Sequence, residues 1–132
     1  MMKTETISAC MQASFADTPF PVVVQTLAGA GVTSYRADLM TLRKTYYDAG
    51  TDAIDEPMPL RDAPTVAAAF DRDTVAATVK AIQQKKIGYA EFLRRIMAAG
   101  CASYAVFFGG RKAMYFGRDG QFYTEPFPAA AN

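Results

Sequence analysis

The sequence predicts an α+β fold in which a helix–helix–three-strand unit occurs twice in tandem. The two units are expected to form one antiparallel sheet covered on one face by helices. The first observation behind this prediction is internal similarity. Residues 20–59 align without a gap with residues 89–128, and eight of the forty pairs are identical, where unrelated segments would share about two or three. The identical pairs are Ala30/Ala99, Gly31/Gly100, Ser34/Ser103, Tyr35/Tyr104, Tyr46/Tyr115, Glu56/Glu125, Pro57/Pro126 and Pro59/Pro128.

The second observation is a change of period within each half. Apolar residues at helical spacing give way, after a glycine, to alternation with period two. A chain of 132 residues can bury about two thirds of its unfolded surface, whereas half of that length would be marginal alone. We therefore expect one domain over residues 1–132, with halves at about 1–59 and 70–128 that share a core and a connection over residues 57–72.

Four segments have the apolar spacing of helices: 4–16, 19–30, 75–84 and a segment centred on 92–96. Thr18 and Pro19 are suited to the N-cap and first turn of the second helix. Asp73 is the expected N-cap of the third helix. The second and fourth helices are expected to end at Gly31 and Gly100, because glycine accepts the left-handed conformation at a helix C-terminus. The connection is expected to include a helical turn over residues 66–70.

Six segments have the alternation of strands: 35–39, 43–47, a short segment ending at Glu56, 103–108, 112–116 and 122–125. The hairpin turns of the second half are expected at Gly109-Gly110 and Asp119-Gly120, where glycine accepts a positive φ. The expected core combines strand and helix residues: Tyr35, Leu39, Tyr104, Val106, Phe108, Leu27, Val79, Ile82, Phe92 and Ile96.

Composition excludes several classes of function. Histidine is absent, which removes Ser–His and Cys–His nucleophile pairs and imidazole metal ligands. The spacing of Cys10 and Cys101 matches no zinc or redox motif, so both are interpreted as reduced core thiols. We expect no metal, no cofactor and no catalytic constellation. No signal peptide or membrane span is expected, and the cytoplasm is the default location. A net charge of +1 argues against general nucleic-acid binding.

The positions at which the two halves differ suggest a functional face. Alternation places Tyr35 on the face that packs against the helices, and Arg36 and Asp38 on the other face. The second half carries Ala105 and Phe107 at the positions of Arg36 and Asp38. A face that combines these charges with Phe107 is a candidate partner interface or ligand groove; a solvated sheet surface is the alternative.

Three other patterns have ordinary structural explanations. The aromatic residues of the hairpins could stack nucleic-acid bases, but cross-strand packing is the more common role. Paired cations such as Arg43-Lys44 and Arg111-Lys112 could bind an anion, but basic residues at strand ends usually protect sheet edges. Glu56 and Glu125 could form an acid–base pair if the fold brought them together; the alternative is that each simply ends a strand.

Several segments together resemble a known family over nearly the whole chain. They are Phe92–Cys101, Tyr115–Gly120, Glu125–Pro128, Ala37–Leu39 and Lys44–Tyr47. The combination is similar to the YdfO-like family of small bacterial and prophage proteins, often labelled "phage envelope protein". The resemblance implies an α+β domain of unassigned role and supplies no catalytic residues. Members often carry histidine where Arg36 and Tyr123 stand, so a histidine-dependent activity is not implied for this chain.

Two functional hypotheses follow, and both remain open at this point. The first is a non-enzymatic binding or interaction protein of bacterial or prophage origin, forming a homodimer through a sheet face or edge. The second is a small cofactor-independent enzyme or small-ligand carrier that uses polar groups on the open sheet face. The residues assigned to this ligand or partner face are Arg36, Asp38, Lys44, Tyr46 and Phe107, with the tyrosine as a candidate acid.

Overall fold

The computed structural model describes residues 2–128 and contains the two expected helix–helix–three-strand units. The first unit comprises α1 (Thr4–Phe15), α2 (Phe20–Gly29), β1 (Ser34–Asp38), β2 (Arg43–Tyr47) and β3 (Ala53–Pro57). The second comprises α3 (Arg72–Gln83), α4 (Tyr89–Ala98), β4 (Cys101–Phe107), β5 (Lys112–Gly117) and β6 (Phe122–Pro126). No helix in this part of the chain is both long and apolar enough to cross a membrane.

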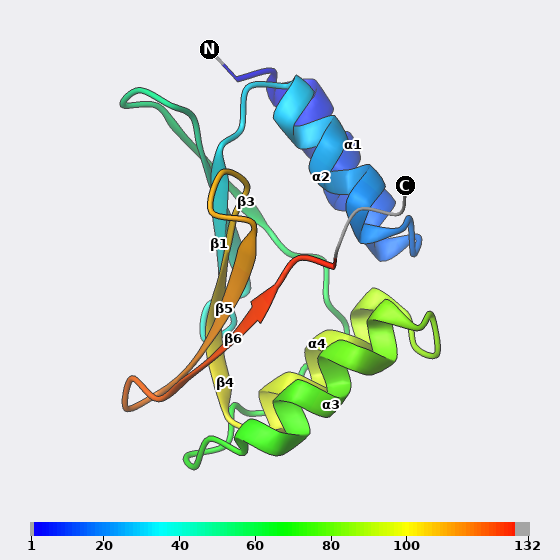
Figure 1. Cartoon of the computed structure of the whole chain (residues 1–132), viewed down its shortest axis with the longest axis vertical. Coiled ribbons are helices and arrows are strands. Elements are labelled where there is room, and N and C mark those ends of the chain that lie inside the picture. Colours follow the sequence, from blue (N-terminus) through cyan, green and yellow to red (C-terminus); the bar gives the residue numbers. More distant parts are fainter. Residues whose placement is uncertain (1, 129–132) are drawn as a thin grey trace.

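All six strands form one sheet with the order β3-β2-β1-β4-β5-β6, and every neighbouring pair is antiparallel. The helices form two antiparallel pairs, α1 with α2 and α3 with α4, and both pairs lie on the same side of the sheet (Figure 1). The other side, which we call the open face, carries no helix (Figure 1). The α+β class and the single antiparallel sheet covered on one face are therefore confirmed.

The two units meet at the centre of the sheet with a symmetric register. Arg36 on β1 lies directly opposite Ala105 on β4, and these two residues occupy equivalent positions in the two units. The backbone bonds beyond the strands repeat this symmetry. The amide of Leu39 donates to Ala102 O at 2.9 Å, and the amide of Phe108 donates to Thr33 O at 3.1 Å. The hydrogen bonding between β1 and β4 therefore extends by one residue pair at each end of this central strand pair.

The core lies between the sheet and the helices and contains the residues predicted for it. Ile82 and Phe108 are only partly buried and pack against its margin, and the other predicted core residues are buried. Additional members come from helices and strands alike, such as Ile7 of α1, Leu93 of α4 and Tyr46 of β2. Cys10 and Cys101 are free, buried thiols, as expected.

Four local predictions were wrong. The N-cap residue of α2 is Pro19 and not Thr18, and no side chain caps that helix. The connection contains no helical turn over residues 66–70; Ala67 instead donates its amide to Met97 O at 3.1 Å. The N-cap of α3 is Asp71, whose carboxylate accepts from the amide of Thr74 at 3.1 Å; Asp73 already lies inside the helix. Sequence spacing could not separate two aspartates two residues apart, because either can cap a helix.

The β4–β5 turn lies at Gly109-Gly110 as predicted, and the last correction concerns only its backbone conformation. Gly109 and Gly110 do not take the left-handed conformation; Arg111 does, with φ 54°. Leu42, the equivalent residue of the β1–β2 turn, has φ 56°. The turns therefore share one backbone shape, in which the residue just before the second strand has a positive φ. Glycine occurrence alone suggested a different position.

Candidate functional site

The strand register divides the five predicted site residues between the two faces of the sheet. Arg36, Asp38 and Phe107 lie on the open face, as expected. Lys44 and Tyr46 do not, and their assignment to that face was wrong. Lys44 lies opposite Ala37, and Tyr46 lies opposite Tyr35, both of which are buried under the helices. Directly opposed residues of antiparallel strands share a face, so both side chains point into the core.

On the open face, the three remaining residues have different roles. Asp38 accepts hydrogen bonds from the amides of Met40 and Thr41, at 2.9 and 3.2 Å, and so stabilises the β1–β2 turn. Arg36 is exposed at the centre of the face. Phe107 is half-buried at the end of β4, opposite Ser34. Asp38 therefore has a structural role in the turn, in addition to its place on the open face.

The covered side contains an unusual polar group, which we call the Lys44 cluster. It consists of Lys44, Tyr89, Tyr104, Glu56, Ser8 and Cys10. Lys44 is 3% exposed, and its Nζ donates to the hydroxyl of Tyr89 at 2.9 Å. The hydroxyls of Tyr89 and Tyr104 are hydrogen-bonded to each other. Nζ also lies 4.9 Å from the ring centres of both Tyr35 and Tyr89. A lysine amine is thus held by phenols and aromatic rings.

Glu56 is the cross-strand neighbour of Lys44, yet the two form no ion pair of 4.0 Å or less. Its Oε2 instead accepts a hydrogen bond from Ser8 of α1. Its Oε1 is buried and has no hydrogen-bond partner within residues 2–128. The cluster therefore contains unused hydrogen-bonding capacity on both the amine and the carboxylate.

Burial controls the ionisation of these groups. Removal from water lowers the pKa of Lys44 to about 7, although the nearby Cys10 and Glu56 oppose the shift. Burial likewise raises the pKa of the Cys10 thiol; the amine of Lys44 works against this change and Glu56 adds to it. The phenols of Tyr89 and Tyr104 have pKa values well above the ordinary range, mainly because they are buried. The amine is consequently the group that titrates near neutral pH.

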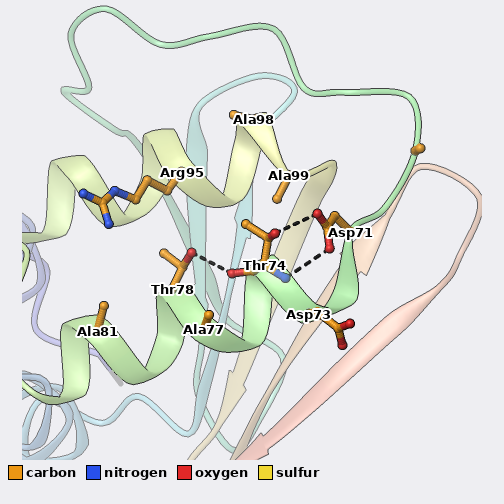
Figure 2. A pocket seen from close by; sticks show the side chains of 10 residues that line it. Asp71, Asp73, Thr74, Ala77, Thr78, Ala81, Arg95, Ala98 and Ala99 are labelled. Carbon is orange, nitrogen blue, oxygen red and sulfur yellow. Dashed lines mark hydrogen bonds between the residues drawn. The ribbon is translucent and has the colours of Figure 1, made fainter.

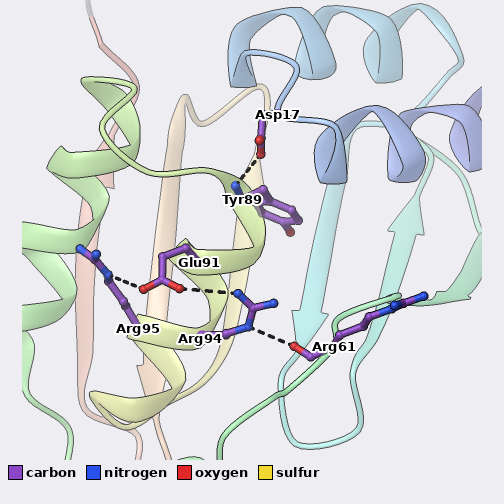
Figure 3. A network of polar contacts seen from close by, with 6 residues as sticks. All are labelled: Asp17, Arg61, Tyr89, Glu91, Arg94 and Arg95. Atoms are coloured by element: carbon purple, nitrogen blue, oxygen red, sulfur yellow. Dashed lines mark hydrogen bonds and ion pairs between the residues drawn. The ribbon is translucent and has the colours of Figure 1, made fainter.

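A contact between the two units holds Tyr89 in place. The amide of Tyr89, at the start of α4, donates to Oδ1 of Asp17 at 2.9 Å, and Asp17 lies in the turn between α1 and α2 (Figure 3). The preceding residue, Gly88, provides no side-chain cap. A Cβ on Gly88 would come within 2.6 Å of the Asp17 carboxylate, so glycine leaves the space that this contact needs. Asp17 therefore caps a helix of the other unit.

We expect Asp17→Ala to lower the free energy of unfolding by about 2 kcal/mol. About 1 kcal/mol comes from the lost cap, and about 1 more comes from forcing alanine into the left-handed region that Asp17 adopts at φ 66°. Asp17→Asn should lose much less, because asparagine accepts the same hydrogen bond and tolerates the same conformation. Urea unfolding measures both changes. Equal losses in the two variants would contradict the assigned role of Asp17.

Glu56 and Glu125 do not form a catalytic pair. They lie on β3 and β6, the two opposite edges of the sheet, so five strand spacings, roughly 24 Å, separate them. Glu125 is fully engaged by neighbours: Tyr123 donates its hydroxyl, Gln83 donates Nε2 at 3.1 Å, and Lys80 forms an ion pair at 3.6 Å. Its role is structural.

Two grooves run along the helix pairs. The larger, about 630 Å³, lies between α3 and α4, and five of its ten lining residues are alanines; Asp71 and Arg95 lie toward opposite ends of it (Figure 2). Asp71 is already bonded to Thr74, and Arg95 is bonded to Glu91 at 2.8 Å (Figure 3). The smaller groove, about 390 Å³, lies between α1 and α2 and includes Cys10 in its lining. Only the smaller groove adjoins the Lys44 cluster.

Sequence reasoning found Lys44 but not its surroundings. Tyr89, Glu56, and the pair Ser8 and Cys10 come from three separate elements, α4, β3 and α1, and only packing brings them together. One signal was present in the sequence: Lys44 stands opposite Ala113 in the comparison of the two halves. A buried strand position that changes from alanine to lysine indicates a polar environment in one half alone.

The fold and site define an α+β protein with one open sheet face and a buried amine on the covered side. No group of three His, Cys, Asp or Glu side chains in the described part of the chain could hold a metal ion. The chain belongs to DUF1398, a family of proteins of unknown function, whose family model matches residues 16–126. The comparison with curated proteins found no match.

Proposed function

We propose that this protein is an interaction protein that associates with a second copy of itself through the open face of its sheet. The observation that carries the proposal is a contiguous apolar patch on strands β4 to β6 of that face. The patch consists of Phe107, Met114, Phe116 and Phe122. Phe122 is 53% exposed, and the other three are half-buried. An exposed apolar patch on a small protein commonly marks an interface.

The open face differs in character between the two units. The first unit presents Arg36, and an ion pair of 2.7 Å joins Arg43 and Asp55. Positions equivalent to Met114 and Phe122 carry Thr45 and Ala53 there. A twofold axis that passes near Met114 would bring two apolar patches together and leave the charged strands at the rim. This division of apolar core and charged rim is typical of protein interfaces.

The edge strands β3 and β6 are poorly suited to pairing with a second copy, which favours self-association through the open face. Both edge strands end in proline, at Pro57 and Pro126. Proline lacks the amide that a neighbouring strand would need, so these edges are poor templates for strand addition. A six-stranded face of short strands is small, and we expect a dissociation constant of roughly micromolar size.

We expect Met114→Lys to abolish self-association, because a charge would be buried at the centre of the patch. Thr45→Lys is the matched control, since it places the same side chain at the equivalent position on the charged half. Sedimentation velocity over a range of protein concentrations measures the dimer fraction, and circular dichroism checks that both variants fold. A wild-type protein that stays monomeric at millimolar concentration, or equal effects of the two variants, would refute the proposal.

The same proposal includes the ancestry and location of the protein. A tandem duplication is supported by the eight identical pairs and by equal φ angles at equivalent turns, 56° at Leu42 and 54° at Arg111. The similarity to YdfO-like proteins supports a bacterial or prophage origin. The free thiols of Cys10 and Cys101 are typical of a reducing compartment such as the cytoplasm.

A further inference from the structure

The environment of Lys44 is unusual because the amine is buried but forms no ion pair of 4.0 Å or less within residues 2–128. The side chain is buried, and the contacts of Nζ are the hydroxyl of Tyr89 and the rings of Tyr35 and Tyr89. The equivalent residue of the other unit is Ala113, which occupies the same kind of buried strand position. A lysine is therefore not needed to complete this sheet, and its presence calls for another explanation.

We infer that Lys44 is a nucleophilic amine that condenses with a small aldehyde or ketone to form an imine. The lone pair of Nζ forms a bond to the carbonyl carbon, the carbonyl oxygen takes up a proton, and the nitrogen gives up the first of its two protons, which leaves a neutral carbinolamine. The hydroxyl then takes up a second proton, the C–O bond breaks, water leaves, and the nitrogen loses its last proton to leave a neutral imine. The reaction consumes one amine and one carbonyl compound and releases one water, with no oxidant or reductant.

The neighbouring groups are suited to the proton transfers. The hydroxyl of Tyr89 lies 2.9 Å from Nζ and can donate to the departing oxygen. Its own hydrogen bond to Tyr104 offers a partner from which the proton can be restored. Glu56, with its unpartnered Oε1, lies opposite Lys44 on the next strand and can stabilise a protonated imine.

The amine is also in a reactive state at neutral pH. Burial lowers the pKa of Lys44 to about 7, so about half of the amine is unprotonated at pH 7, whereas an exposed lysine is unprotonated to the order of 0.1%. The other ionisable groups that influence this equilibrium are Cys10 on α1 and Glu56 on β3, both of which raise the pKa of Lys44. The neutral form is the nucleophile.

The carbonyl compound must approach Lys44 from outside the core, and we assign that approach to the groove between α1 and α2, whose lining includes Cys10. The groove between α1 and α2 reaches Cys10, which is buried and close enough to Lys44 for each group to affect the pKa of the other. A compound that enters beside Cys10 must be small, because protein interiors are closely packed. This site lies on the covered side of the sheet and does not depend on self-association through the open face.

Reductive labelling of the intact protein tests the inference. Acetaldehyde and cyanoborohydride are added at pH 7.0, and peptide mass spectrometry follows ethylation of each lysine with time. We expect Lys44 to react at least about tenfold faster than the exposed Lys86, because its neutral fraction is roughly a thousandfold larger. The rate at Lys44 should follow a titration with a midpoint near pH 7. Labelling of Lys44 that is no faster than that of Lys86 at pH 7.0 would overturn the inference.

Two kinds of variant separate the proposed chemistry from simple accessibility. Tyr89→Phe keeps the ring and removes the hydroxyl, and we expect about tenfold slower labelling of Lys44 with no change at Lys86. Cys10 lines the groove that we assign as the approach to Lys44. Cys10→Ala should therefore widen the approach and speed the labelling of Lys44, whereas the larger side chain in Cys10→Leu should narrow it and slow the labelling. Unchanged rates in Tyr89→Phe would exclude the phenol as proton donor, and that result would contradict the assigned mechanism.

Discussion

Raising the pH from 6.5 to 8.0 is expected to increase the free energy of unfolding by about 1 kcal/mol, because of the single buried amine of Lys44. Its pKa is about 7 in the folded protein, and its ordinary pKa of 10.5 applies to the unfolded chain. Between these values the unfolded chain binds one more proton than the folded chain, so stability rises with pH. Below pH 7 both states are protonated, and holding the charge in the core then costs roughly 5 kcal/mol.

Between pH 6.5 and 8.0, Lys44 is expected to dominate the pH dependence of the free energy of unfolding. The chain has no histidine, so no other side chain has an ordinary pKa between 6.5 and 8.0. Burial raises the pKa of Cys10 above 9.0 and that of Cys101 to about 12. These thiols ionise more readily in the unfolded chain and therefore reduce stability only at higher pH.

Urea unfolding at fixed pH values measures this dependence. In Lys44→Met, a side chain of similar length stays in the core without a charge, and we expect the rise to disappear. The variant should also be the more stable protein at pH 6.5. Lys86→Met removes an exposed lysine and should keep the rise of the wild type. A rise of equal size in wild type and Lys44→Met would show that Lys44 is not the titrating group.

Gly100→Ala is expected to lower the free energy of unfolding by more than about 3 kcal/mol, and at moderate temperature the protein should be largely unfolded. Gly100 follows α4 with φ 92°, and an added Cβ would lie 2.0 Å from the carbonyl oxygen of Ala69. The connection passes this close because the amide of Asp71 donates to Ala99 O at 2.7 Å. The backbone itself must move to admit the methyl group.

Gly29→Ala is the matched control for this substitution. Gly29 is the last residue of α2 in the other unit, and a Cβ there would have no atom within 4 Å. Its substitution should change the free energy of unfolding by no more than about 1 kcal/mol, in the stabilising direction that alanine favours in helices. Chemical unfolding of both variants under one condition gives the comparison. Similar losses would mean that the contact with Ala69 can relax.

The sequence predicted the elements of the fold because each half carries its own periodic signal. The change from helical to alternating spacing after Gly31 and Gly100 located four helices and six strands, and both glycines adopt the expected positive φ, 96° and 92°. Alternation along β1 was also enough to place Arg36 on the open face and Tyr35 in the core. These are local properties, since strand neighbours point to opposite faces whatever the partner strand is.

The candidate site was harder to predict because it depends on pairing. Lys44 is a charged residue and follows another, Arg43, so its sequence context indicates an exposed position in a solvated hairpin. The register instead sets it opposite Ala37, under the helices. A shift of one residue in a strand pair would reverse this outcome, and no pattern within residues 43–47 specifies the shift.

By itself, the sequence of this protein determined two repeating units, their order of elements and the side of β1 that faces the core. Each of these follows from spacing along one segment of chain. Only the tertiary structure decided that Lys44 is buried beside Tyr89 and Glu56, and that Asp17 caps a helix of the other unit. Those contacts join residues up to 72 positions apart, and burial changes the chemistry of an amine only when such distant groups exclude water from it.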